Sequence, residues 1–124
     1  MIIDLRSLTL AALALAAPAL AQPPAKGDAA AGDEAFQIHC AICHLAESGG
    51  QGPSLIGVFG RKAGSAPGFA YSPALAVANV TWDAAHLDRY LENPQAAIPG
   101  AAMPYALADA KTRADVIAYL GTLK

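Results

Sequence analysis

The sequence predicts an all-α fold with about four to five helices, and three observations lead to this prediction. Apolar side chains recur at offsets of three and four residues in two separate stretches, which is the spacing of one helix face. Residues that cap helix N-termini stand directly before several candidate helices. No stretch shows a convincing strand pattern. The 124 residues are enough for one domain.

The first helix is expected at about residues 29–39, with Asp28 as its N-cap. Gly32 and Phe36 lie four residues apart within it and share one face. Glycine costs roughly 1 kcal/mol in a helix interior relative to alanine. Either the helix simply tolerates Gly32, or another helix crosses closely at that point.

Two more helices are expected in the middle of the chain. Ser72-Pro73 starts a short helix that ends near Asn79, because proline suits the first helical position. Thr81 is the candidate cap for a helix from about 82 to about 93, which stops at Asn93-Pro94 because a residue before proline avoids the helical region. The inward stripe of this helix is Leu87, Tyr90 and Leu91.

The last helix is expected to run from an Asp109 cap to about Thr122. Arg113 and Asp115 are expected to face solvent. The apolar stripe of this helix is Val116, Tyr119, Leu120 and Leu123. The stretches expected to be loops are 45–53, 57–68 and 95–104.

Residues 1–21 have the pattern of a secretory signal peptide, which leaves a mature domain of residues 22–124 in the periplasm. An apolar run follows Arg6, and Ala19-Leu20-Ala21 forms an A-x-A-type cleavage site. The run is shorter than the roughly 20 apolar residues that span a bilayer, so cleavage is favoured over a membrane anchor. The formal net charge is −2 and there is no basic run, which argues against a nucleic-acid partner.

The only two cysteines lie in the stretch Cys40-Ala41-Ile42-Cys43-His44. C-x-x-C-H is the attachment signature of a c-type haem, with a thioether from each sulfur and the histidine on the iron. The alternatives are a disulfide, a dithiol redox pair and a zinc site. Dithiol motifs usually lie in a strand–helix–strand context, and structural zinc needs four ligands. The sequence offers neither, and the adjacent histidine favours haem over a disulfide.

Met103 is the candidate for the second axial ligand. A lone methionine is more often core filler, but Met103 lies in the Pro- and Gly-rich stretch 95–104, where a helical core residue is not expected. It follows His44 by 59 residues, enough chain to reach the opposite face of the ring. His/Met ligation raises the reduction potential. The rivals are His39, too near the proximal side, and His86, expected on a helix surface.

Further short motifs accompany C-x-x-C-H along nearly all of the mature chain. They are Gly27-Asp28, Gly52 to Leu55, Gly57 to Lys62, Ala66 to Tyr71, Trp82, Tyr90 to Pro94, Ile98 to Gly100 with Met103, and Arg113 to Leu120. In these motifs the chain resembles the class I monohaem cytochromes c, particularly the mitochondrial and alphaproteobacterial type. The resemblance implies the class I cytochrome c fold, wrapped around one covalently bound haem c.

The resemblance also implies roles for individual residues around the haem. Arg61, Tyr71 and Trp82 would neutralise or hydrogen-bond the propionates, since buried carboxylates need partners. The Pro53 carbonyl would accept the second N–H of His44, as metal-bound histidines normally require.

Two more contacts follow from the resemblance. Tyr90 would lie near the Met103 sulfur. Gly32 and Phe36 would pack where the terminal helices cross, against Val116 and Tyr119.

Several positions depart from the mitochondrial pattern. Leu75 stands where an asparagine lies near the inner propionate, Ala101 and Ala102 replace a polar and a basic residue, and Tyr105 stands near an exposed phenylalanine. The lysine ring around the family's exposed haem edge is nearly absent. The lysines of the mature chain are Lys26, Lys62, Lys111 and Lys124. Because charge steers encounter, a strongly acidic docking partner is disfavoured.

These observations predict a soluble, monomeric periplasmic electron carrier, not an enzyme, with a haem c ligated by His44 and Met103. Its expected partners are membrane or periplasmic oxidases, reductases or dehydrogenases. One alternative is peroxide or gas chemistry at a labile Met103 bond, motivated by Leu75, Ala101 and Ala102. A haem subunit of a larger dehydrogenase or oxidase is a third possibility.

Overall fold

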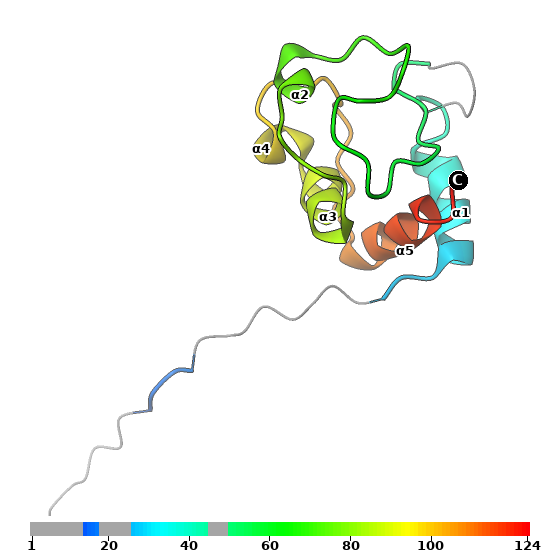
Figure 1. Ribbon diagram of the computed structural model, residues 1–124. Helices are drawn as coiled ribbons and strands as arrows, with labels where there is room; N and C mark the ends of the chain where they lie inside the picture. Colours follow the sequence, from blue (N-terminus) through cyan, green and yellow to red (C-terminus); the bar gives the residue numbers. More distant parts are fainter. Residues whose placement is uncertain (1–13, 18–25, 45–49) are drawn as a thin grey trace, which may run out of the picture.

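The computed structural model describes residues 14–17, 26–44 and 50–124, and these ranges contain five α-helices (Figure 1). The helices are α1 (Ala29–His39), α2 (Pro73–Ala76), α3 (Ala84–Glu92), α4 (Pro94–Ala97) and α5 (Ala110–Leu120). The β pairing found in this part of the chain is one isolated bridge between Lys62 and Thr81. The predicted all-α fold is therefore confirmed.

The predicted signal peptide, residues 1–21, lies outside the described residues apart from 14–17. Among the residues that are described, no helix combines the length and apolar character needed to cross a bilayer.

The helix starts follow from side-chain caps, with one correction. The Asp28 carboxylate accepts the Ala30 N–H at 2.9 Å, as predicted for α1. The Asp109 carboxylate likewise accepts the Thr112 N–H at 2.8 Å at the start of α5. The prediction of Thr81 as the cap of α3 is wrong.

Asp83 caps α3 instead, by accepting the His86 N–H at 2.8 Å. The helix starts late because the backbone before it pairs with the 60–63 segment. The Trp82 N–H donates to the Arg61 carbonyl at 2.9 Å, and the Ala63 N–H donates to the Val80 carbonyl at 2.8 Å.

The stretch predicted as a loop from residue 95 begins instead with helix α4. Pro94 does end α3, as expected, but proline also suits a first helical position. The Asn93 side chain then caps α4 by accepting the Ala96 N–H at 3.1 Å. The same dipeptide therefore stops one helix and starts the next. α2 ends at Ala76, three residues before the predicted end.

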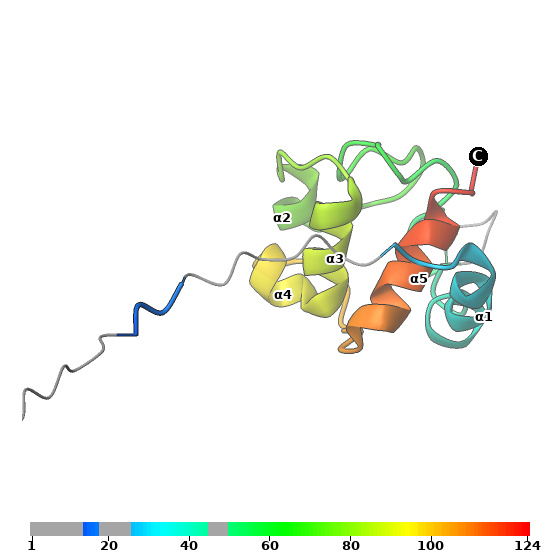
Figure 2. The ribbon, with the colours of Figure 1, turned by 90° about the horizontal axis from the view of Figure 1, so that it is seen from below.

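Arg113 and Asp115 are buried, at 5% and 6% exposure, so the prediction that they face solvent is wrong. Helix α5 lies between α1 and α3 (Figure 2), and its charged groups are satisfied by both neighbours. The Arg113 Nε–H donates to Asp88 of α3 at 2.8 Å. Asp115 accepts the backbone N–H of Asp28 at 2.8 Å and both its oxygens bind Lys111.

Helices α1 and α5 cross with their backbones in close approach. A Cβ added to Gly32 would lie 1.9 Å from the Asp115 carbonyl oxygen, and one added to Gly27 would lie 1.9 Å from that of Ala114. The rings of Phe36 and Tyr119 meet beside the crossing, with centroids 5.2 Å apart. The close-crossing explanation of Gly32 is thus the correct one.

We expect Gly32→Ala to destabilise the folded protein by about 1–3 kcal/mol, because the added methyl must push two backbones apart. Gly121→Ala is the matched control. An added Cβ there would meet its nearest neighbour at 3.4 Å, an ordinary contact. Denaturant unfolding measures both variants, and equal midpoints for the two would contradict the prediction.

Acid should weaken the α1–α5 crossing through Asp115. The Asp28 N–H, and then Lys111, hold the pKa of this carboxyl below its ordinary value of 3.8. A carboxyl with a lowered folded-state pKa contributes stability above its unfolded pKa and loses it as pH falls through the folded value. Asp115→Asn should therefore lower stability at neutral pH and flatten its decline as pH falls from about 5 through the lowered folded-state pKa of this carboxyl.

The control for this prediction is Glu34→Gln, which removes an exposed carboxylate on α1. Urea unfolding across the pH range provides the measurement. An Asp115→Asn protein with the same pH slope as the parent would show that this carboxylate does not couple stability to pH.

Candidate haem site

The Cys-x-x-Cys-His stretch forms helical turns that continue directly from α1. The N–H groups of Cys40 and Ala41 both donate to the Phe36 carbonyl at 2.9 Å. The His44 N–H then donates to the Cys40 carbonyl at 3.0 Å. The direction of α1 therefore fixes where Cys40, Cys43 and His44 lie.

Both cysteines are half-buried, and no disulfide joins them to each other. Burial, and then the proximity of Cys43, raises the pKa of the Cys40 thiol to about 11. A dithiol redox pair needs a lowered thiol pKa, and thiolate is also the form that binds zinc. The raised pKa of Cys40 therefore gives no support to these two alternatives, both of which use the thiolate.

His44 is oriented by the loop that begins at residue 50. Its Nδ1 lies 2.8 Å from the Pro53 carbonyl oxygen. Because a carbonyl only accepts hydrogen bonds, Nδ1 carries the proton and Nε2 keeps its lone pair for a metal. Gly52 leaves room for the ring, since a Cβ there would lie 2.4 Å from His44 Cε1.

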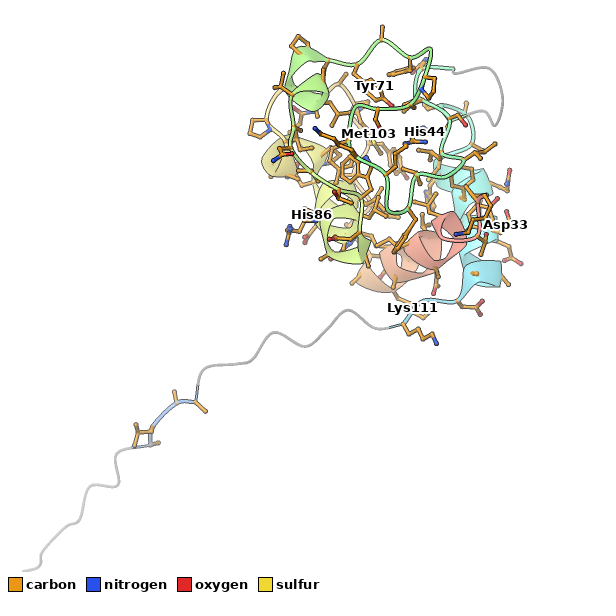
Figure 3. All side chains as sticks on the ribbon, in the orientation of Figure 1. Asp33, His44, Tyr71, His86, Met103 and Lys111 are labelled. Atoms are coloured by element: carbon orange, nitrogen blue, oxygen red, sulfur yellow. The ribbon has the colours of Figure 1, made fainter. Side chains whose placement is uncertain are left out.

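Met103 lies in a tightly restrained segment after α4, half-buried against the core. Gly100 turns the chain with φ of +90°, a conformation that favours glycine. The Gln95 amide donates to the Ala101 carbonyl, and to the Met103 carbonyl at 3.4 Å. In the view of Figure 3, the labelled Met103 and His44 side chains both fall within the outline of the green loop.

The two rival histidines have other partners. His86 Nδ1 lies 2.8 Å from the Asp83 carboxylate, and the side chain points outward from α3 (Figure 3). His39 Nδ1 lies 2.6 Å from the Tyr105 hydroxyl at the surface. Neither imidazole faces the region between His44 and Met103 in these interactions.

Arg61 provides the observation that fits a haem propionate. Its two terminal nitrogens donate to the Ile56 carbonyl at 2.9 Å and to the Ser54 carbonyl at 3.2 Å. Its Nε is buried and has no hydrogen-bond partner in the described structure. A buried N–H without an acceptor is costly, and a carboxylate placed there would satisfy it.

Two aromatic residues predicted to serve the propionates lie on neighbouring segments. The Tyr71 hydroxyl accepts the Ala66 N–H at 3.0 Å, which leaves its own O–H free to donate elsewhere. Trp82 is buried and its backbone pairs with that of Arg61. Tyr90 packs on Trp82, with ring centroids 4.9 Å apart, and burial raises the pKa of its phenol. Its approach to the Met103 sulfur stays a prediction.

Three residues support the site through contacts that the sequence did not predict. Gly52 is part of a recognised motif, but its contact with His44 has no sequence signal. Gln95 carries no signal either, since an amide after Asn93-Pro94 looks like an ordinary surface residue. Arg113 donates to the carbonyls of Leu107 at 3.0 Å and Ala108 at 2.8 Å, and so restrains the segment after Met103.

Comparison with known proteins gives a consistent result. Residues 29–124 match the family model described as Cytochrome c. Cytochrome c of Chlamydomonas reinhardtii is 52% identical over 89 residues, which are 68% of this chain and 80% of that protein. Cytochrome c2 of Rhodomicrobium vannielii is 49% identical over 87 residues, covering 67% and 70% of the two chains.

A solved structure shares the fold as well as the sequence. Cytochrome cH from Methylobacterium extorquens superimposes with a TM-score of 0.74 at 47% identity, and the match covers 77% of this chain and 99% of that one. The family match and the identities of its relatives thus agree with the geometry around Cys40, Cys43 and His44. The chain belongs to the cytochrome c family, and it carries one covalently bound haem c.

Proposed function

We propose that this cytochrome c is a periplasmic one-electron carrier whose haem iron is bound by His44 on one face and Met103 on the other. The observation that carries the proposal is the hydrogen bond from His44 Nδ1 to the Pro53 carbonyl, which leaves Nε2 free for the iron. The haem supplies the redox chemistry, since its iron gains or loses one electron. The protein supplies attachment, ligands and a low-polarity surrounding.

The chain's own residues divide this work. Cys40 and Cys43 hold the ring in place through thioethers. The Pro53 carbonyl fixes the orientation of His44 and increases its basicity as a ligand. Arg61, Tyr71 and Trp82 serve the propionates, and the unpartnered Arg61 Nε supports this role most directly.

The restraint of the Met103 segment supports a closed iron site. Gln95 holds it from α4 by bonding the carbonyls of Ala101 and Met103. A thioether ligand kept in place leaves no open position on the iron. The alternative of peroxide or gas chemistry gains no support from the relatives, which are cytochromes c and c2.

Export completes the proposal. Residues 1–21 direct the chain to the periplasm, where haem is joined to C-x-x-C-H proteins, and cleavage leaves residues 22–124. Cytochromes c2 of the bacteria Rhodomicrobium vannielii and Magnetospirillum molischianum are among the relatives. The proposed partners are oxidases, reductases or dehydrogenases of the membrane or periplasm, which a monomer would meet in transient encounters.

The test is potentiometric titration of the exported holoprotein, combined with its oxidised visible spectrum. We expect reversible one-electron reduction and a sulfur-to-iron charge-transfer band. Met103→Ala should abolish the band and lower the potential, because the thioether is the ligand that raises it. His39→Ala and His86→Ala are controls that should leave both unchanged. A high-spin wild-type spectrum, or a band that survives in Met103→Ala, would refute Met103 as the ligand.

We expect Gln95→Ala to loosen the Met103 segment, because it removes two hydrogen bonds worth about 0.5–1.5 kcal/mol each. Imidazole added to the oxidised protein competes with Met103 for the iron. The apparent affinity of imidazole should therefore be roughly tenfold higher for Gln95→Ala than for the wild-type protein. Gln95→Glu keeps the side-chain shape without the N–H donors and should behave like Gln95→Ala. Gln37→Ala on α1 is the control, and a Gln95→Glu protein with wild-type imidazole affinity would contradict the prediction.

A further inference from the structure

Residues 102–106, which include Met103, form an exposed span between two buried backbone anchors. The first anchor is Ala101, whose N–H donates to the Ile98 carbonyl at 3.0 Å. The second anchor is Leu107, whose N–H donates to a carbonyl of α3 at 2.7 Å. Both anchors are buried, whereas the span is exposed apart from the half-buried Met103. The proposed ligand is therefore held at both ends by the half of the fold that contains α3 and α4.

A side-chain hydrogen bond ties this span to the other half of the fold. The Tyr105 hydroxyl lies 2.6 Å from His39 Nδ1, and the two rings lie 5.9 Å apart. His39 is the last residue of α1, directly before the cysteine attachment turn. Either tautomer of the imidazole can form the bond, because a phenol hydroxyl both donates and accepts. Among the described residues, this is the hydrogen bond that joins the 102–106 span to the helix leading to His44.

The place of this bond in the chain gives it a consequence for ligand exchange. Tyr105 follows Met103 by two residues, in a short span that is fixed at both ends. For Met103 to give way to another iron ligand, the span must shift, and the Tyr105 hydroxyl must then leave His39. The free energy of the hydrogen bond is therefore added to the cost of releasing Met103.

We propose that His39 and Tyr105 are positioning residues, a clamp that keeps Met103 in its ligand position against competing ligands. The proposal rests on the proposed ligation of the iron by Met103. The potential and the charge-transfer band belong to the closed form, in which Met103 is the ligand, so loss of the clamp leaves both unchanged while the closed form predominates. What changes is the equilibrium between the closed form and the open form, from which Met103 has withdrawn.

Imidazole titration of the oxidised holoprotein measures this equilibrium, because imidazole enters only the open form. The charge-transfer band disappears as imidazole binds, and its loss gives the apparent affinity. Tyr105→Phe keeps the ring and removes the hydroxyl, so we expect it to raise the apparent imidazole affinity by about fivefold. His39→Phe keeps a ring and removes both ring nitrogens, and it should give a similar increase.

A double-mutant cycle separates this hydrogen bond from general loosening of the fold. Because both substitutions break the same bond, the protein that carries Tyr105→Phe and His39→Phe together should show about the same fivefold increase as either alone. Independent effects would instead multiply to roughly 25-fold. Tyr119→Phe is the matched control, since it removes a hydroxyl that bonds the Asp33 carboxylate at the α1–α5 crossing. It should leave the imidazole affinity within about twofold of the wild-type value.

A second readout does not depend on ligand exchange. Nitrogen-15 nuclear magnetic resonance of the reduced holoprotein reports the hydrogen bonding of the His39 ring, and its Nδ1 signal should move in Tyr105→Phe and stay in place in Tyr119→Phe. Wild-type imidazole affinity in Tyr105→Phe, multiplied effects in the double variant, or an Nδ1 signal unaffected by Tyr105→Phe would overturn the clamp. A wild-type protein without the charge-transfer band would instead refute ligation by Met103, and the Nδ1 signal would still show whether the span is tied to α1.

Discussion

The close approach of α1 and α5 is the constraint on which the haem site depends. Gly27 and Gly32 allow it, because any side chain at either position would overlap the backbone of α5. The turns that hold Cys40, Cys43 and His44 continue from α1, so their position follows from the angle of this crossing. The bond from the Asp28 N–H to Asp115 fixes the other end of α1. One contact between distant segments thus orients the attachment motif.

Helix α5 also organises the opposite half of the site. Its Arg113 reaches α3 through Asp88 and holds the carbonyls of Leu107 and Ala108, just after the Met103 segment. The two proposed axial ligands are fifty-nine residues apart in sequence. Helix α5 contacts the segments that carry both of them, since it packs on α1 before His44 and bonds the chain just after the Met103 segment. A burial cost for the guanidinium is offset by three hydrogen bonds, which explains how a charged residue can occupy this position.

Sequence reasoning predicted the all-α class, the α1 and α5 caps and the haem, because these depend on local spacing and residue type. It misplaced what depends on tertiary contact. Thr81 seemed a cap, yet its backbone pairs with Lys62. Arg113 and Asp115 seemed solvent-facing, since a charged pair on a helix usually is. Only the position of α5 between two helices reverses that expectation. His44 is proposed as a ligand from the C-x-x-C-H motif, and Met103 from its position in the Pro- and Gly-rich stretch 95–104.

Two supports around the Met103 segment were hidden from the sequence for a common reason. Gln95 and Arg113 both bind main-chain carbonyls, and every residue carries a carbonyl, so no residue type marks the acceptor. The bond of His44 to the Pro53 carbonyl was predicted only through the family resemblance. These bonds to the main chain also change the meaning of Ala101 and Ala102. Alanine at these two positions, in place of the polar and the basic residue of the mitochondrial pattern, suggested a loosely held Met103 segment. Yet the bonds that restrain it come from Gln95 and Arg113 and end on backbone oxygens. Alanine keeps those oxygens, so the substitutions remove surface charge while leaving the restraint of the ligand in place.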